Sequence, residues 1–174
     1  MSYDKWDLRF LAMADHVAQW SHGPRTRVGA VIVRPDRTIA ATGYNGPPVG
    51  FDDVAFLAMP REQQLEIVVH AEINAIASAR QSVVGCTLYV TPLHCCSRCA
   101  SVIVNAGIKR VVSFCGHTTN DWHESFKLSK TIFDSAGVET LQINDEPAFV
   151  KNFENLMEQK LERKYPAYTS SHRK

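Results

Sequence analysis

A continuous hydrophobic run is missing from the start of this 174-residue sequence. The opening stretch MSYDKWDLRFLAMADHVAQW carries Asp and Arg among its apolar residues, which fits neither a signal peptide nor a membrane span. We therefore expect a cytoplasmic protein with no membrane association. Internal repeats, linkers and low-complexity blocks are missing as well, so we expect one domain over residues 1–165 and a frayed tail over residues 166–174.

An excess of charge of either sign is also missing, because the net charge is +1. A protein that grips long nucleic acid needs a broad basic face, so this balance argues against such a partner. A phosphorylated small molecule needs only one or two local cations and is not excluded. The hydrophobic share of 45% and the charged share of 21% are typical of a chain that folds on its own.

Cysteines are unevenly placed, with none in residues 1–69 and three between Cys95 and Cys99. The total of five is odd, and the three neighbouring thiols are too crowded for a framework of disulfides. Clustered cysteines in a chain without a signal peptide indicate metal binding or redox chemistry in a reducing compartment.

Hydrophobic periodicity, together with Gly and Pro, divides the chain into alternating helices and strands. Pro35 and Asp36 mark the turn of an early hairpin, and strands alternate with helices from residue 60 onward. This order predicts an α/β domain with a mostly parallel sheet between two layers of helices. We expect helices over residues 4–21, 60–80, 96–107, 121–137 and 146–165, two strands within residues 27–46, and single strands over residues 86–91, 108–114 and 138–143.

One histidine and two cysteines are expected to meet at one end of this sheet. His70 lies near the N-terminal end of a predicted helix, Cys96 begins the next helix, and one strand separates them. A helix–strand–helix unit can bring both helix N-termini to the same end of a sheet, where Cys99 joins them. Imidazole and thiolate ligands suit zinc, and three protein ligands leave one position for water, as in catalytic zinc sites.

A carboxylate stands two residues after the histidine, at Glu72. It is close enough in sequence to reach the zinc-activated water without binding the metal. Zinc lowers the pKa of a bound water from 15.7 to about 7, and a neighbouring carboxylate can take up the proton and return it. Glu72 is therefore the candidate catalytic residue.

This pattern of His-x-Glu and a later Cys-x-x-Cys resembles the zinc-dependent cytidine/deoxycytidylate deaminase superfamily, and its deoxycytidylate branch most closely. The resemblance spans residues 5–143 and includes RVGAVIVRPDRTIAATGYNG, VVHAEINAI, CTLYVT, CASVIVNAGIKRVV and SAGVE. It implies a three-layer α/β/α fold whose five-stranded mixed sheet has strands four and five parallel. It also implies one catalytic Zn²⁺ per chain, a small-molecule nucleotide as substrate, hydrolytic conversion of dCMP to dUMP with release of ammonia, and a homo-oligomer.

The resemblance further implies contacts to the substrate. Asn45 would bind the sugar hydroxyl, the backbone amide of Ala71 would touch the base, and Gly29 would lack a Cβ because the base packs there. Asn45 could instead be a turn residue in the left-handed conformation, and Gly29 could mark a bulge. Trp122 and Phe126 are spaced as core residues of a helix.

A phosphate contact is implied for Arg25, just before the first strand, because a planar guanidinium suits a phosphate group. Alternatively, Arg25 is a loop arginine that contacts only solvent. Arg27, Lys109 and His117 are further alternatives for this contact.

Two departures from the family pattern leave alternatives open. Cys95 occupies the place of the usual proline, which allows a rival pairing of Cys95 with Cys99, although Cys-x-x-Cys spacing favours Cys96. Several deoxycytidylate deaminases hold an extra structural zinc through cysteines near the first helix and in the loop after Gly-Tyr-Asn-Gly. Because residues 1–69 contain no cysteine, the resemblance implies a single zinc here and leaves regulation by nucleoside triphosphates in doubt. Other readings are a deaminase of cytidine, cytosine or tRNA adenosine, an inactive paralogue, or a non-catalytic zinc module closed by Cys95 or His94.

Overall fold

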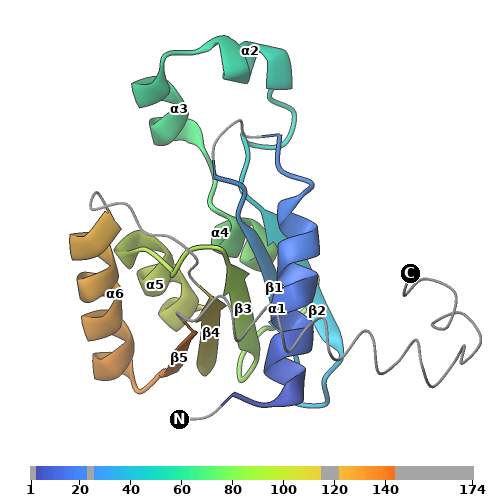
Figure 1. Cartoon of the computed structure of the whole chain (residues 1–174), viewed down its shortest axis with the longest axis vertical. Helices are drawn as coiled ribbons and strands as arrows, with labels where there is room; N and C mark the ends of the chain where they lie inside the picture. Colours follow the sequence, from blue (N-terminus) through green and yellow to red (C-terminus); the bar gives the residue numbers. More distant parts are fainter. Residues whose placement is uncertain (1–2, 23–25, 115–121, 144–174) are drawn as a thin grey trace, which may run out of the picture. The chain divides into compact units, whose positions relative to one another are not determined.

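The computed structural model describes residues 3–22, 26–114 and 122–143. Contacts divide the chain into two units, residues 1–144 and 145–174, and every described residue lies in the first unit (Figure 1). The helix and the tail predicted within residues 146–174 lie outside the described residues, so the single domain over residues 1–165 stays a prediction. None of the described helices has the length and apolar character needed to cross a membrane.

Five strands form one mixed sheet in the order β2-β1-β3-β4-β5. The first pairs antiparallel with both of its neighbours, whereas the last three strands run parallel to one another. This arrangement confirms the predicted five-stranded sheet with strands four and five parallel. The strands are β1 (Gly29–Val33), β2 (Ile39–Tyr44), β3 (Thr87–Thr91), β4 (Arg110–Phe114) and β5 (Glu139–Ile143).

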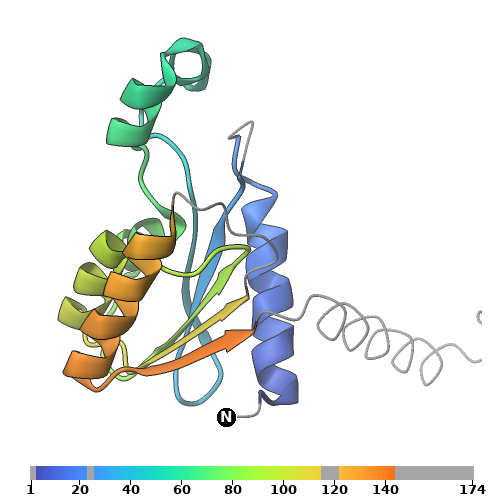
Figure 2. The ribbon, with the colours of Figure 1, turned by 60° about the vertical axis from the view of Figure 1, so that its left-hand side comes forward.

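Helices cover both faces of the sheet, which confirms the predicted three-layer arrangement. Helix α1 (Lys5–Ala18) packs across β1 and β3 on one face. On the other face lie α4 (Ala71–Ser78), α5 (Ser97–Asn105) and α6 (His123–Ala136), with the sheet between the two layers (Figure 2). Side chains from β1, β3 and β4 and from the inner faces of the helices are fully buried between the layers and form the core.

The predicted helix over residues 60–80 is wrong, because the structure contains two helices there. Helix α3 (Arg61–Ile67) ends at Val68, and α4 begins after His70. Val69 between them pairs with Gly46, accepting from Gly46 N at 3.1 Å and donating to Gly46 O at 2.8 Å. Two successive β-branched valines favour the extended backbone that this pairing needs, and the break makes His70 the N-cap of α4.

A short helix that the sequence did not predict precedes α3. Helix α2 (Asp53–Ala58) begins after Asp52, whose carboxylate accepts a hydrogen bond from Ala55 N at 2.7 Å. Such a cap satisfies one of the free N–H groups of the first turn. Helices α2 and α3 project beyond the sheet at the end where α4 and α5 begin (Figure 1).

Two glycines on neighbouring strands let helices approach opposite faces of the sheet. Gly43 pairs with Ala30, the neighbour of Gly29, so the missing side chains of the two glycines would point in opposite directions. A Cβ at Gly29 would lie 2.0 Å from the carbonyl oxygen of Ala14 in α1, and a Cβ at Gly43 would lie 2.3 Å from the amide nitrogen of Ala75 in α4. Hence α1 and α4 both rest directly on strand backbone.

A partly buried ion pair and a hydrogen bond fasten α1 to the amino end of β4 and the middle of β3. Arg110 donates from Nη1 to Asp7 Oδ1 at 2.6 Å and from Nη2 to Asp7 Oδ2 at 3.0 Å, and the hydroxyl of Tyr89 donates to Asp7 Oδ1 at 3.0 Å. Burial raises the pKa of Asp7, but hydrogen bonds from Arg110, Asp4 N and Tyr89 outweigh that effect and lower it below the usual 3.8. Asp7 is therefore ionised in the folded protein at neutral pH.

Candidate active site

Two helix N-termini meet beyond the carboxyl end of β3, as the sequence predicted. His70 is the N-cap of α4 and Cys96 is the N-cap of α5, while Cys99 lies in the first turn of α5. Free N–H groups and the positive end of the helix dipole favour a thiolate at such positions.

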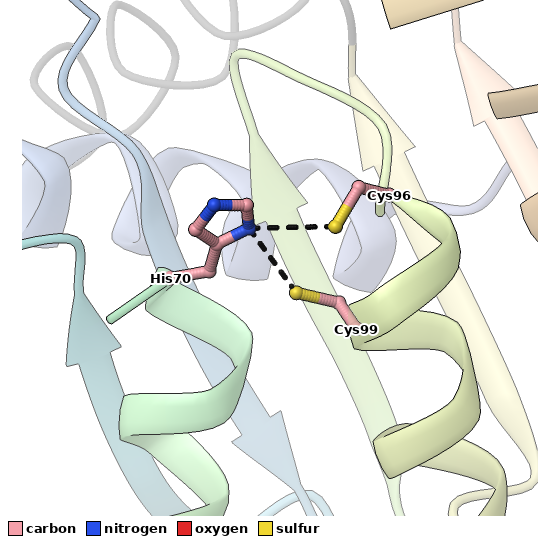
Figure 3. Close-up of side chains that lie close together, drawn as sticks. All are labelled: His70, Cys96 and Cys99. Carbon is pink, nitrogen blue, oxygen red and sulfur yellow. Dashed lines mark hydrogen bonds between the residues drawn. The ribbon is translucent and has the colours of Figure 1, made fainter. Parts of the chain in front are cut away.

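His70, Cys96 and Cys99 form one group whose ligand atoms all lie within 4.8 Å of one another. His70 Nδ1 lies 3.4 Å from Cys96 Sγ and 3.3 Å from Cys99 Sγ (Figure 3). Ligand atoms around a tetrahedral zinc with N and S ligands are about 3.5 Å apart. The three side chains therefore already have the spacing that a zinc ion requires.

The same contacts set the protonation of the two thiols. A hydrogen bond from the thiol of Cys99 lowers the pKa of Cys96 to about 4, against burial and with a further contribution from His70. The hydrogen bond to Cys96 and burial both raise the pKa of Cys99. Hydrogen bonding to Cys96 also raises the pKa of His70, against the effect of burial. These contacts therefore favour the thiolate form of Cys96 over that of Cys99.

Glu72 lies in the first turn of α4, beside this group, and only 3% of it is exposed. Burial raises the pKa of its carboxyl group, although hydrogen bonds from its own amide and from the thiol of Cys95 and the charge of His70 oppose the rise. A buried carboxyl group with a raised pKa at the edge of a cavity is suited to take up and release a proton.

Cys95 is buried but is not a member of the ligand group. Its thiol hydrogen-bonds to the carboxylate of Glu72, so the structure brings together Cys96 and Cys99 rather than the rival pair of Cys95 and Cys99. His94 also lies outside the group, and its Nδ1 is 2.6 Å from Ser113 Oγ. Within the part of the chain that the structure describes, neither Cys95 nor His94 supplies a fourth ligand.

A cavity of about 190 Å³ opens over the group and is lined by His70, Ala71, Glu72 and Cys96. Its remaining walls come from segments far apart in the sequence: the residues before β1, the residues after β2, helices α2 and α3, the loop between β3 and α5, and the start of α6. The walls are mainly apolar with a few polar groups, as is usual for small-molecule sites.

Trp122 and Phe126 form an aromatic wall of this cavity. Their rings stack at 6.2 Å between centroids, the Trp122 ring meets that of His70 edge-on at 6.0 Å, and the Phe126 ring meets that of His94 at 5.6 Å. Sequence spacing assigned both aromatic residues to the core. The parallel order of β3 and β4 could have indicated their position at the cavity, because it places the start of α6 at the same end of the sheet as the start of α5.

Two of the four predicted substrate contacts line the cavity. Ala71 is fully buried there, and Asn45 lines the cavity from the segment after β2. The side chain of Asn45 accepts from Val28 N at 2.7 Å and donates to Thr26 O at 3.0 Å, so it fixes the segment that enters β1. Its φ angle is not positive, which is contrary to the left-handed turn considered from the sequence.

The other two predicted contacts are Gly29 and Arg25. Gly29 is absent from the cavity lining, and the close approach of α1 explains why it has no Cβ. Arg25 lies outside the described residues, as does His117. Contacts of Gly29 and Arg25 with a substrate stay predictions.

The fold and the site together are those of a zinc-binding hydrolytic enzyme, and comparison with known proteins gives the family. Residues 4–115 match the family model described as the cytidine and deoxycytidylate deaminase zinc-binding region. An uncharacterised deaminase of Aliivibrio fischeri is 40% identical over 139 residues, covering 78% of this chain and 91% of the relative. Human deoxycytidylate deaminase is 38% identical over 144 residues, covering 78% of each chain.

Solved structures agree with this result. The dCMP deaminase of cyanophage S-TIM5, in complex with dCMP and dUMP, has a TM-score of 0.63 and 26% sequence identity, and covers 82% of this chain and 100% of the other. The chain therefore belongs to the cytidine and deoxycytidylate deaminase family. It is accordingly a hydrolytic deaminase with zinc as its cofactor.

Proposed function

We propose that this protein converts dCMP to dUMP with release of ammonia. The observation that carries the proposal is the group of His70, Cys96 and Cys99 at the floor of an apolar cavity, with buried Glu72 beside it. The names of the human relative and of the cyanophage structure support the choice of a deoxycytidylate substrate.

In this proposal the three ligating residues are His70, Cys96 and Cys99. A zinc ion held by them supplies Lewis acidity that makes water a nucleophile at neutral pH. One histidine and two cysteines leave a position for the reacting groups, as catalytic zinc sites require.

Glu72 moves the protons of the reaction. As water adds to C4 of cytosine, the carboxylate accepts one proton of the water and passes it to N3. It then transfers the proton of the new C4 hydroxyl to the amino group, which departs as ammonia while the C4 carbonyl forms. Water and cytosine thus give uracil and ammonia, with no other reactant. Burial of Glu72 supports this role, because it raises the pKa of the carboxyl group and so favours uptake of a proton.

Other residues hold the substrate in this proposal. The amide of Ala71 contacts the base, and Trp122 and Phe126 exclude water from one side of the cavity. Asn45 binds the sugar hydroxyl with the amide hydrogen and lone pair that its bonds to the entry segment leave free. Arg25 contacts the phosphate.

The proposal extends to the setting of the enzyme. We expect a cytoplasmic homo-oligomer that acts on free nucleotides and not on long nucleic acid. The clustered reduced cysteines and the net charge of +1 support the location and the exclusion of nucleic acid, respectively.

An ammonia-release screen tests the proposed function. Purified protein with measured zinc content is given dCMP, dCTP, deoxycytidine, cytosine and a tRNA anticodon arm in parallel. The highest kcat/KM is expected for dCMP. A higher value for deoxycytidine or for the tRNA arm would change the substrate class, and a zinc-loaded protein with no turnover would indicate a binding module.

A further inference from the structure

We propose that Arg61 contacts the phosphate of the substrate and thereby makes the enzyme prefer a nucleotide over a nucleoside. This inference rests on the proposed deamination of dCMP and adds a residue that sequence reasoning missed. Its basis is the way α3 lies against the cavity.

One face of α3 forms a wall of the cavity. The lining residues Arg61, Gln64, Leu65 and Val68 follow the spacing i, i+3, i+4 and i+7, which places them on a single stripe of a helix. Leu65 and Val68 are apolar, so Arg61 is the member of this stripe that carries a charge.

Arg61 is the only lysine or arginine among the described residues that line the cavity. Its guanidinium forms no hydrogen bond or ion pair with any other residue that the structure describes, and the side chain is exposed at the cavity rim. Five N–H donors in a planar fork are therefore available to a phosphate.

Arg61 also lies at a suitable distance from the reacting end of the cavity. Val68 stands two residues before His70, and the seven-residue step from Arg61 to Val68 corresponds to about 10 Å along a helix. In a nucleoside monophosphate, the C4 amino group and the 5′-phosphate lie at opposite ends of the molecule. A base placed beside His70 therefore directs the phosphate toward the far end of α3.

Hydrogen bonds hold the first turn of α3, which carries Arg61, against the end of α2. Gln64 donates from Nε2 to Met59 O at 2.8 Å and to Leu57 O at 3.3 Å, which ties the start of α3 to the end of α2. A guanidinium held on a braced turn loses less conformational freedom when it binds an anion than one on a free loop.

The test compares dCMP with deoxycytidine in the wild-type protein and in Arg61→Ala, Arg61→Lys and Arg25→Ala variants. The matched control is Arg80→Ala, because Arg80 is exposed and does not line the cavity. Arg61→Ala should lower kcat/KM for dCMP by about tenfold or more, as expected for loss of a charge-assisted hydrogen bond. It should leave kcat/KM for deoxycytidine within about twofold.

Two further readouts separate a phosphate contact from a structural role. Arg61→Lys should recover part of the loss, because it keeps the charge but not the fork. Added salt should raise KM for dCMP in the wild-type protein more steeply than in Arg61→Ala, because an exposed ion pair is screened. Arg80→Ala should behave as the wild-type protein does in every assay.

Equal losses on dCMP and deoxycytidine, or no loss on dCMP, would overturn the role of Arg61. If only Arg25→Ala loses dCMP activity, the phosphate contact belongs to Arg25 alone and the inference is wrong. A wild-type protein that releases no ammonia from dCMP refutes the proposed function as well, whereas full dCMP activity in both wild type and Arg61→Ala refutes the inference only.

Discussion

Replacing Gly43 by alanine should impair both the stability of the fold and the activity of the site. Gly43 is buried in β2, and a Cβ there would lie 2.3 Å from Ala75 N and 2.5 Å from Ala71 O. Ordinary Cβ contacts begin near 3.4 Å, and the obstructing atoms are backbone, so α4 has to move away from the sheet by about 1 Å. Helix α4 carries His70 at its N-cap and Glu72 in its first turn.

The expected magnitudes follow from that displacement. Overpacking a close-packed interface costs about 1–3 kcal/mol of unfolding free energy. For a chain of this size, each kcal/mol corresponds to a fall of about 2–4 °C in Tm. A misplacement of about 1 Å at reacting groups costs about a hundredfold in rate, so kcat of Gly43→Ala should fall by about that factor.

Two matched variants make this prediction specific. Gly29→Ala has an equally severe clash, but with α1 on the opposite face, so Tm should fall while kcat per bound zinc changes by no more than about threefold. Gly46→Ala meets no atom nearer than 3.9 Å and should keep the wild-type Tm. Thermal unfolding, zinc content and ammonia release are measured on each protein.

The reasoning fails if Gly43→Ala keeps the wild-type Tm and kcat, because α4 would then not depend on the missing Cβ. It also fails if Gly29→Ala loses as much activity per zinc as Gly43→Ala does. General instability, and not displacement of α4, would then explain the loss.

Three further outcomes are expected. Glu72→Gln should lower kcat by about 10²–10⁴-fold with zinc content unchanged, and an active variant in the ammonia assay would contradict the proton-transfer role. Removing zinc with a chelator should abolish turnover and lower Tm. A ligand at a hundred times its Kd stabilises the folded state by about 2.7 kcal/mol, and this stabilisation is lost with the metal. An unchanged Tm would show that the metal does not bind the folded chain selectively. The folded pKa of Asp7 lies below its unfolded value of 3.8, so its stabilising contribution is present above that value and is lost as pH falls through the lowered folded pKa. The Asp7→Asn variant should therefore be about 2–3 kcal/mol less stable than the wild-type protein at neutral pH, and it should lose less stability than the wild type on acidification. Denaturant unfolding at several pH values tests both expectations. If the free energy of unfolding depends on pH in the same way in both proteins, Asp7 does not have this role.

Local patterns account for the parts of the fold that the sequence predicted. Hydrophobic periodicity located the sheet and the helices that flank it, and Gly107 and Gly137, with φ of 78° and 66°, end α5 and α6 where expected. The meeting of His70 with Cys96 and Cys99 was also predictable, because a helix–strand–helix unit places the two helix starts at one sheet end.

Features that depend on contacts distant in sequence were not predicted. The break between α3 and α4 depends on the pairing of Val69 with Gly46, a residue after β2. The missing Cβ of Gly29 was attributed to packing of the substrate base, because the close approach of α1 could not be predicted from local sequence. Trp122 was assigned to the core for the same reason, since helical spacing identifies an apolar face but not whether a cavity lies against it.

The ion pair that stabilises the layers and the residues of the candidate active site lie toward opposite ends of the sheet. Asp7 joins α1 to Arg110 at the amino end of β4 and to Tyr89 in the middle of β3, whereas Cys96 follows the carboxyl end of β3. Parallel strands bring their carboxyl ends, and the helix starts that follow, to one edge, which is why reactive groups gather there. The ion pair at the other edge can therefore stabilise the layers without restricting what the cavity binds. In our proposal, substrate choice then depends on the segments added beyond the sheet, and among the described residues that line the cavity Arg61 of α3 is the only lysine or arginine.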